Sequence, residues 1–569
     1  MHRYIADPSV SISRGIPLSD EKGLGALTLG GFLHDVTGRY AGREALVHRH
    51  EDGTVERWSY AELWSQSMAV ARSLIASGLG KGERVGVLMT NRPEFLAAVF
   101  GTALAGGVAA PISTFSTPAE LAYLLDLSSV SVLLFERSVL KKDFLEILSD
   151  LVPGITSSSS GPLAPDTLPY LRSLAMVGHG AAGQVQSWRA FLDAGADVAA
   201  AWITERRERT SPADSGVLFF SSGSTAKPKG ILSAHRSVTL QMWRMGPQQA
   251  LTDGVRSWTA NGFFWSGNFA MIVGGTLASG GSIVLQRTFQ PAEALDMMES
   301  EKVEFLFAWP HQWEQLLEAP NWASCDLSSL VFMDPSSPIA SHPTVDVSWI
   351  EPRHCYGNTE TFTLSTAYPA RTTREEAADS HGLPLPGNII KIVEPQTGRT
   401  VPLGERGELA VKGPTLMLGY LGVPLSDTLD DEGFFRTGDA GWLDEAGRLH
   451  WEGRLNDIIK TGGANVSPLE IDDVIRKLPE VKVVQTVGVP HETLGELVVS
   501  CIVLHDGTKL DEQAVRSHVS ETLASYKVPR RVIFFEEDAL TLTGSAKVKT
   551  AELRNLAAAK LTDSDSTVM

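Results

Sequence analysis

Between residues 83 and 112, short apolar runs alternate with a longer segment of helical pattern. Residues 83–89 (Glu-Arg-Val-Gly-Val-Leu-Met) and 107–112 (Gly-Val-Ala-Ala-Pro-Ile) have the length and composition of buried strands. The segment from Pro93 to Ala105 between them has the pattern of a helix. This strand–helix–strand order predicts a parallel sheet and an α/β fold.

The last hundred residues have a different pattern. Residues 481–489 and 497–504 are strand-like runs, and Asp511 follows them as a candidate helix N-cap. Three apolar side chains then recur at four-residue spacing, as on one face of a helix: Val515, Val519 and Leu523. These features predict a small α+β unit, and we place its border just after Arg454. The expected domains are residues 1–455 and 456–569.

Length and charge narrow the class of protein. A chain of 569 residues with 43% hydrophobic content exceeds the size at which one core stops growing, so at least two domains are expected. The net charge of −18 argues against nucleic acid or an anionic membrane as the main partner. Three widely spaced cysteines indicate neither a disulfide framework nor a zinc site. We find no signal peptide and no membrane span, and predict a cytoplasmic enzyme of small molecules.

A loop rich in serine, threonine, glycine and lysine follows the apolar run 217–220. It spans Ser221 to Gly230, and its backbone N–H groups, hydroxyls and ammonium groups are suited to phosphate oxygens. The order of residues is not that of a Walker A loop, because no Gly-Lys-Ser/Thr closes it. A phosphate site of another kind and a plain polar surface turn both fit the loop taken alone.

Four further segments decide between these readings. They are Tyr356-Gly357-Asn358-Thr359-Glu360, Arg436-Thr437-Gly438-Asp439, Gly453-Arg454-Leu455-Asn456-Asp457 and Gly544-Ser545-Ala546-Lys547. Together with the loop, in this order and spacing, they resemble the motifs of the adenylate-forming superfamily of acyl-CoA synthetases, non-ribosomal adenylation domains and luciferases. The resemblance covers about residues 30–555. It implies a large N-terminal part of α/β subdomains with mixed sheets, and a small α+β C-terminal lid.

The resemblance also implies an activity and its cofactors. Such enzymes use ATP and Mg²⁺ to convert a carboxylic acid to an acyl-AMP, release pyrophosphate, and pass the acyl group to a thiol such as that of CoA. Two anions must meet at the α-phosphorus, so cationic groups and N–H donors are needed where charge builds up. The residues expected to bind ATP are Ser221, Ser222, Gly223, Ser224, Thr225, Ser336, Ser337, Tyr356, Gly357, Asn358, Thr359, Asp439 and Arg454.

Individual roles follow from the same resemblance. Tyr356 would stack on the adenine, and Asp439 with Arg454 would hold the ribose. Glu360 would bind Mg²⁺, a hard cation that takes oxygen ligands and keeps waters and phosphates in its shell. The expected catalytic residues are Lys547, Glu360, Thr225 and Lys229, and Lys549 is the rival of Lys547.

Two chemical steps at one site imply two poses of the C-terminal lid. One pose presents Lys547 to the acid and the α-phosphate, and the other opens a channel for the thiol. Asn456 lies at the expected hinge. Gly462 and Gly463 are the candidates for lining the channel, because glycine leaves room for a pantetheine arm.

Some positions depart from the family pattern. Ala226 and Ala546 replace glycines, the adenine loop reads Pro335-Ser336-Ser337-Pro338, and the hinge is Asn456, where Asp or Lys is common. An alanine is costly wherever the backbone needs a positive φ. Because the charged catalytic positions are retained, we interpret the chain as a working enzyme.

The acid is expected to be apolar. No carboxylate occurs from Asn261 to Ser282, the region in which amino-acid-activating relatives hold the substrate ammonium, so a free amino acid is disfavoured. The candidate acyl-pocket residues are Phe264, Trp265, Gly267, Trp309 and His311. Core packing is the alternative role for each tryptophan. Fatty, aryl and alicyclic acids all fit this reading.

Three function classes stay open. The first is a carboxylic acid–CoA ligase, favoured by the run from Asp457 to Val466, which closely resembles fatty and aryl CoA ligases. The second is an acyl-AMP ligase that hands its acyl group to a carrier protein, and the third is a non-catalytic protein that binds a nucleotide or an adenylate. The expected partners are a small-molecule carboxylic acid, ATP and CoA, and the chain is expected to be a monomer or homodimer.

Overall fold

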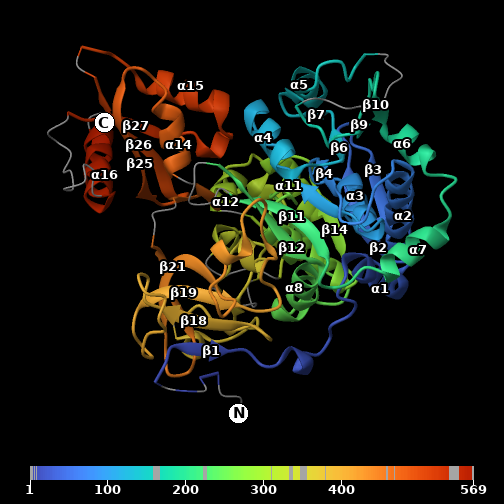
Figure 1. Ribbon diagram of the computed structural model, residues 1–569, viewed down its shortest axis with the longest axis horizontal. Helices are drawn as coiled ribbons and strands as arrows, with labels where there is room; N and C mark the ends of the chain where they lie inside the picture. The colour runs from blue at the N-terminus through green and yellow to red at the C-terminus, as the bar shows by residue number, and fades with distance from the viewer. Residues whose placement is uncertain are drawn as a thin grey trace.

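The computed structural model describes residues 4–5, 7, 9–157, 167–221, 227–308, 310–331, 337–346, 355–378, 380–455, 459–466, 468–505, 507–536 and 550–566. A large N-terminal part of α/β and β subdomains carries a smaller α+β domain at its C-terminal end (Figure 1). The expected fold class is confirmed. No helix in the described part of the chain is at once long enough and apolar enough to cross a membrane.

The largest sheet of the N-terminal part contains the predicted strand–helix–strand unit. Among the described residues it has eight strands, in the order β10-β9-β6-β4-β5-β11-β12-β20. Strands β10 to β11 are parallel, and β12 and β20 are added in antiparallel at one edge. The bounds are β4 (Arg84–Leu88), β5 (Val108–Pro111), β6 (Val132–Glu136), β9 (Ser173–Val177), β10 (Val185–Ser187), β11 (Ser215–Ser221), β12 (Lys229–Ala234) and β20 (Gly419–Tyr420).

Two five-stranded sheets also belong to the described residues of the N-terminal part. One has the order β15-β13-β14-β2-β3, with β15 (Phe305–Phe307), β13 (Arg256–Thr259), β14 (Ser282–Leu285), β2 (Glu44–Arg49) and β3 (Val55–Ser59). The other is antiparallel, in the order β1-β18-β19-β21-β22, with β1 (Ile12–Arg14), β18 (Ile389–Val393), β19 (Gly407–Lys412), β21 (Phe435–Leu443) and β22 (Leu449–Arg454). This antiparallel sheet lies beside the lower edge of the molecule in Figure 1.

Helices cover both faces of the two α/β sheets. One core joins both sheets to α1 (Leu29–Tyr40), α2 (Tyr60–Ala76), α3 (Pro93–Leu104) and α8 (His235–Gln248). The opposite face of the eight-stranded sheet packs on α4 (Pro118–Ser128) and α5 (Phe144–Leu151). The opposite face of the second sheet packs on α11 (Pro291–Ser300) and α12 (Pro310–Leu317). Helix α4 faces the C-terminal domain and contacts its helix α15 (Figure 1).

The C-terminal domain is built as its hydrophobic pattern predicted. Its sheet has the order β24-β23-β26-β25, with β27 beside β26: β23 (Ile459–Thr461), β24 (Ala464–Val466), β25 (Val481–His491), β26 (Gly495–Leu504) and β27 (Arg531–Phe534). Helices α14 (Pro468–Ile475) and α15 (Glu512–Thr522) cover one face, and α16 (Thr550–Ser566) covers the other. The carboxylate of Asp511 accepts a hydrogen bond from the Ala514 N–H as an N-cap, and Val515, Val519 and Leu523 are buried.

Shorter elements connect these units. They include α6 (Trp188–Ala194), α7 (Ala200–Glu208), α9 (Ser266–Asn268), α10 (Gly275–Ala278), α13 (Arg374–Ala377), β7 (Ser138–Val139), β8 (Lys142–Asp143), β16 (Thr366–Ala367) and β17 (Leu383–Pro384). Between α9 and α10 the helix widens into a π-helix, Phe269–Gly274.

Candidate functional site

The phosphate loop connects two paired strands. Ser221 ends β11 and Lys229 begins β12, and the two residues face each other in the ladder. The five residues between them, Ser222, Gly223, Ser224, Thr225 and Ala226, lie outside the described residues. The Oγ atom of Ser221 is buried and makes no hydrogen bond to any described residue. An orphaned hydroxyl is costly unless a ligand or water completes it, so its place at the mouth of this loop fits a polar ligand.

Glu360, Tyr420 and Lys229 form a cluster beside the loop. The Tyr420 hydroxyl donates a 2.8 Å hydrogen bond to Glu360 Oε1. The Lys229 Nζ lies 4.7 Å from the centre of the Tyr420 ring, and β20 carries this tyrosine alongside β12. Among the described side chains nothing bonds to Glu360 Oε2. A half-buried carboxylate with one oxygen oriented and the other available fits a Mg²⁺ ligand, since this ion takes one or two protein carboxylates together with phosphates and water.

Tyr356 and Asp439 form a second pair of predicted site residues. The Tyr356 hydroxyl donates a 2.7 Å hydrogen bond to Asp439 Oδ2, and the exposed fractions of the two residues are 5% and 3%. In the β21–β22 ladder Asp439 stands opposite Arg454. The structure describes the backbone of Arg454 but not its side chain. The Tyr356 hydroxyl therefore orients one oxygen of the Asp439 carboxylate.

The residues between Tyr356 and Glu360 form a tight turn. Asn358 caps the 3-10 helix Thr359–Thr361, and its Oδ1 accepts a 3.0 Å hydrogen bond from the Thr361 N–H. A Cβ on Gly357 would lie 2.0 Å from the Thr363 carbonyl oxygen, so only glycine fits there. The amide oxygen of Asn358 is thus used within the turn, while Ser336 lies outside the described residues. The buried Ser337 Oγ, like that of Ser221, makes no hydrogen bond to a described residue.

Phe264 and Trp265 lie where the N-terminal part meets the C-terminal domain. Phe264 contacts Trp265 and Phe115, with ring centres 5.6 and 5.8 Å apart. Trp265 also meets the Tyr526 ring of the C-terminal domain edge to face at 6.1 Å. Gly267 lies in α9 behind them and faces Thr363. Trp309 and the side chain of His311 lie outside the described residues.

The Gly462–Gly463 turn of the C-terminal domain forms a wall of a cavity with Trp265. This cavity has a volume of about 310 Å³ and is also lined by Gly262, Ser525 and Tyr526. The φ angles of Gly462 and Gly463 are +54° and +79°, a region that disfavours side chains, so the turn requires glycine. The structure therefore places both glycines at the domain junction, beside the aromatic residues of the predicted acyl pocket.

A larger cavity adjoins the first. It has a volume of about 860 Å³, and the two cavities share Phe115, Ala260, Gly262, Gln312, Ser525 and Arg530. Of the described residues that line it, none is acidic, and five are basic: Lys141, Lys142, Arg287, Arg516 and Arg530. Arg287 is paired with Glu136, and Lys142 donates to three carbonyls, of Thr114, Phe115 and Ser116. Lys141, Arg516 and Arg530 form no ion pair with a described residue and could meet an anion.

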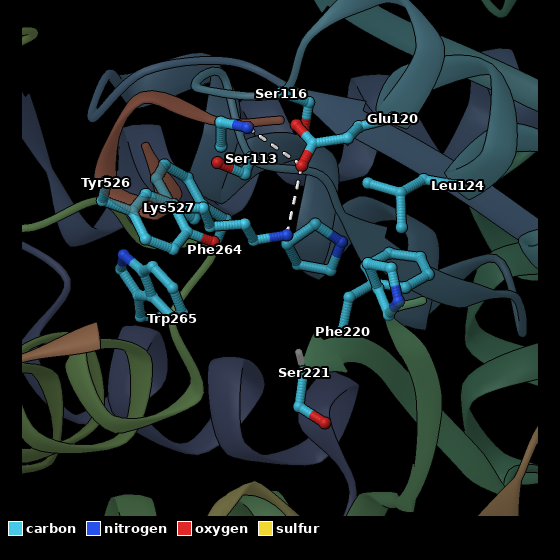
Figure 2. Close-up of a pocket in the computed structure, with 13 residues that line it drawn as sticks. Ser113, Ser116, Glu120, Leu124, Phe220, Ser221, Phe264, Trp265, Tyr526 and Lys527 are labelled. Atoms are coloured by element: carbon cyan, nitrogen blue, oxygen red, sulfur yellow. Dashed lines mark hydrogen bonds and ion pairs between the residues drawn. The ribbon is translucent and has the colours of Figure 1, made fainter. Parts of the chain in front are cut away.

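A small cavity of about 50 Å³ between Ser221 and Trp265 is closed on one side by a buried ion cluster (Figure 2). Lys527 Nζ lies 3.1 Å from Glu120 Oε1 and 2.9 Å from Glu470 Oε1. Burial raises the pKa of Glu470 to about 7 although Lys527 opposes the shift, and the pKa of Lys527 is raised above its usual value because Tyr526, Glu470 and Glu120 outweigh its own burial. The cluster joins α4 of the N-terminal part to the C-terminal domain.

Some of these residues were not predicted from the sequence. Tyr420, Glu120 and Lys527 lack any local motif that marks them as part of a site. The pattern Thr117-Pro118-Ala119-Glu120 does have the form of a capping box, and it starts α4. The predicted residues Asn456 and Lys547 also lie outside the described residues, as does Lys549.

The chain matches two family models and is similar in sequence to named acyl-CoA ligases. The family model for AMP-binding enzymes matches residues 33–421, and the model for the C-terminal domain of AMP-binding enzymes matches residues 470–547. The chain is 27% identical over 557 residues to the medium-chain acyl-CoA ligase ACSF2, mitochondrial, of Homo sapiens, covering 94% of this chain and 88% of the relative. It is 29% identical over 555 residues to the acyl-CoA ligase SID4 of Ajellomyces capsulatus, covering 93% of this chain and 91% of the relative.

A solved structure has the same architecture. The amide bond synthetase McbA from Marinactinospora thermotolerans superposes with a TM-score of 0.72 at 25% identity, and the match covers 92% of this chain and 99% of that one. The chain is thus similar in sequence to proteins named acyl-CoA ligases and in fold to one named an amide bond synthetase.

Proposed function

Because the chain belongs to the family of AMP-binding enzymes, we propose that it is an ATP-dependent ligase that joins an apolar carboxylic acid to the thiol of CoA. In the first step a carboxylate oxygen attacks the α-phosphorus of ATP, and pyrophosphate leaves. In the second step the sulfur of CoA attacks the acyl carbonyl, the thiol proton is released, and AMP leaves. The products are an acyl-CoA, AMP and pyrophosphate.

One observation carries the proposal most strongly. The turn Gly462–Gly463 shares a cavity with Trp265, and that cavity adjoins a larger one lined by basic residues without an acidic one among those described. A cavity with an aromatic wall that adjoins a larger cavity with basic side chains suits an acceptor with a thin uncharged arm and a phosphorylated end. CoA has this form.

The nucleotide would be held by the residues around β11, β12 and β21. Ser221 and Lys229 would contact the phosphates, and Asp439 would accept the ribose hydroxyls, because the other carboxylate oxygen is already oriented by Tyr356. Glu360 Oε2 is the atom that would hold Mg²⁺, with Tyr420 fixing the carboxylate. When bound, the ion would neutralise charge on the phosphate oxygens during pyrophosphate departure.

Lys547 is proposed to stabilise the charge that develops as the carboxylate meets the α-phosphate, and Asn456 is proposed as the hinge. Phe264 and Trp265 are proposed to contact the acyl group, because both present aromatic surface at the cavity walls. An apolar fatty, aryl or alicyclic acid fits such a wall. The domain border after residue 455 and a cytoplasmic location stay predictions.

Two other acceptors remain as alternatives. A carrier protein would present the same phosphopantetheine arm but fill the basic chamber differently, and an amine acceptor is suggested by the name of McbA. An amine does not need a cationic chamber. The basic side chains Lys141, Arg516 and Arg530 therefore favour CoA over a simple amine.

The experiment that tests the proposal uses purified full-length protein with ATP, Mg²⁺ and a panel of fatty, aryl and alicyclic acids. Each acid is tested with CoA, with pantetheine, with a simple primary amine and without acceptor, while pyrophosphate and acyl products are followed by mass. We expect pyrophosphate release and a CoA thioester with one class of acid. Acyl-AMP that moves to the amine but not to CoA would overturn the choice of acceptor, and ATP binding without pyrophosphate release would overturn the ligase itself.

A further inference from the structure

We propose that Glu120 is a positioning residue for the thiol-transfer step. It fixes the C-terminal domain, through Lys527 and the backbone of Ala524, in the orientation that puts the Gly462–Gly463 turn beside Trp265. The inference rests on the proposed function, since it concerns the second of its two steps. Glu120 does not touch the reacting atoms in this account and acts through the domain that it holds.

The contacts of Glu120 cross from α4 to the C-terminal domain. Its Oε1 accepts hydrogen bonds from Lys527 Nζ at 3.1 Å and from the Ala524 N–H at 3.0 Å, both drawn in Figure 2. One turn earlier the Thr117 hydroxyl donates a 2.6 Å hydrogen bond to the Thr522 carbonyl. The side chains of Glu120 and Lys527 are only 8% and 3% exposed. A charged hydrogen bond shielded from water contributes more than an exposed one, so this contact is a substantial part of the docking.

The same contacts shape the proposed thiol channel. Tyr526, next to Lys527 in the chain, meets the Trp265 ring and lines the cavity that contains Gly462 and Gly463. Ala524, Tyr526 and Lys527 also line the small cavity that reaches Ser221. The contact between Lys527 and α4 therefore keeps Tyr526, which forms one wall of the channel, against the part of the site proposed to bind the acyl group and the nucleotide.

Both halves of the contact keep a partner when the domains separate. Within the N-terminal part, Glu120 Oε2 accepts a 3.0 Å hydrogen bond from the Thr117 N–H as part of the α4 capping box. Within the C-terminal domain, Lys527 lies 2.9 Å from Glu470. Leaving a buried charge without a partner is costly, and this arrangement avoids it. The contact is thus suited to repeated docking and release, which two poses of the lid require.

The direct test is Glu120→Gln, with the two steps measured separately. Glutamine can keep the capping box but loses the charge that meets Lys527. The matched control is Glu62→Gln, which makes the same change in the exposed capping box of α2, far from the C-terminal domain in sequence. We expect ATP–pyrophosphate exchange within about twofold of wild type and thioester formation reduced about tenfold or more, the scale of a lost charged hydrogen bond. The control should change neither rate.

A second variant, Glu470→Gln, should have the opposite effect on the relative rates of the two steps. In Glu470→Gln, Lys527 has Glu120 as its one remaining carboxylate partner in this cluster, so release of the domain would leave the ammonium unpaired. We expect the docked pose to persist and pyrophosphate exchange to slow relative to thioester formation. Equal slowing of both steps in both variants would mean a merely structural role and would overturn the proposal.

The position of the C-terminal domain can also be measured without CoA and without the thioester reaction. Spin labels on the exposed positions Glu146→Cys in α5 and Gln513→Cys in α15, in a Cys355→Ser background, report the distance between the two domains. We expect the fraction of the docked distance to fall in Glu120→Gln. An unchanged distance distribution would overturn the proposal. Wild-type protein that forms acyl-AMP but no CoA thioester would instead overturn the proposed function, and the label distances would still decide the role of Glu120.

Discussion

Asp439→Asn should weaken the binding of ATP through its ribose and through nothing else. The carboxylate of Asp439 is 3% exposed, and one of its oxygens is fixed by the Tyr356 hydroxyl at 2.7 Å. Asparagine has nearly the same size and can still accept the bond from Tyr356, so the fold should tolerate the change. What it loses is the negative charge that a pair of ribose hydroxyls would meet.

The size of the effect follows from the hydrogen bonds involved. Hydrogen bonds to charged groups contribute about 1.5–3 kcal/mol and bonds between neutral groups about 1 kcal/mol. With one carboxylate oxygen already engaged, one to two ribose bonds weaken, which gives a loss of roughly 1–3 kcal/mol. The expected result is a rise of about 5- to 150-fold in the KM for ATP.

The assay is pyrophosphate release with ATP and with 2′,3′-dideoxy-ATP, which lacks both hydroxyls. The wild type should lose affinity when the hydroxyls are removed, whereas Asp439→Asn should lose little more, because the two changes remove one interaction. Tyr356→Phe is the companion variant, since it removes the hydroxyl that orients the carboxylate and keeps the ring. If Asp439→Asn weakened both nucleotides by the same factor, Asp439 would not bind the ribose.

Three further outcomes are expected. Trp265→Ala should shift the preferred acid to a bulkier one and lower kcat/KM for the best wild-type acid about 10- to 100-fold, as read from the acid panel; an unchanged profile would remove Trp265 from the acyl pocket. Arg530→Ser should raise the KM for CoA about two- to fivefold and leave that for pantetheine unchanged, because an exposed cation contributes little more; equal effects on both thiols would contradict the phosphate contact. Burial raises the pKa of Asp472 in the folded protein to about 7. The unfolded chain releases this proton at a lower pH than the folded protein does, so the free energy of unfolding falls as pH rises from about 4 to 7. Asp472→Asn should therefore stabilise the protein more at pH 8 than at pH 5.5, by about 2 kcal/mol, in urea titrations.

The local pattern correctly predicted the six elements that the sequence analysis named. Strands β4 and β5 with α3 between them, and β25, β26 and α15 in the C-terminal domain, all follow from short-range periodicity and capping. In each, residues close in sequence bury one face, so the sequence contains the signal. The π-helix Phe269–Gly274 was not predicted, because it differs from an α-helix by one residue of backbone register rather than by its apolar pattern.

The site was only partly predictable. Tyr356 and Asp439, from two of the motifs that the sequence analysis named, contact each other, and family resemblance pointed to both because it carries long-range information that periodicity lacks. The contact between Glu120 and Lys527 joins residues 407 positions apart, and no local rule predicts such a pair. The hydrogen bond from Tyr420 of β20 to Glu360 likewise joins two residues that are distant in sequence. Contacts of this kind form only when the folded units pack against each other, so the local sequence does not predict them.

The most direct test of the central claim is to follow oxygen from the acid. A carboxylic acid labelled with ¹⁸O in both carboxyl oxygens is incubated with the protein, ATP, Mg²⁺ and CoA, and the AMP is analysed by mass. If the carboxylate attacks the α-phosphorus and the thiol then displaces AMP, each AMP carries one ¹⁸O and the thioester carries the other. Unlabelled AMP, or ADP in its place, would show that the acid is not activated as an acyl-adenylate.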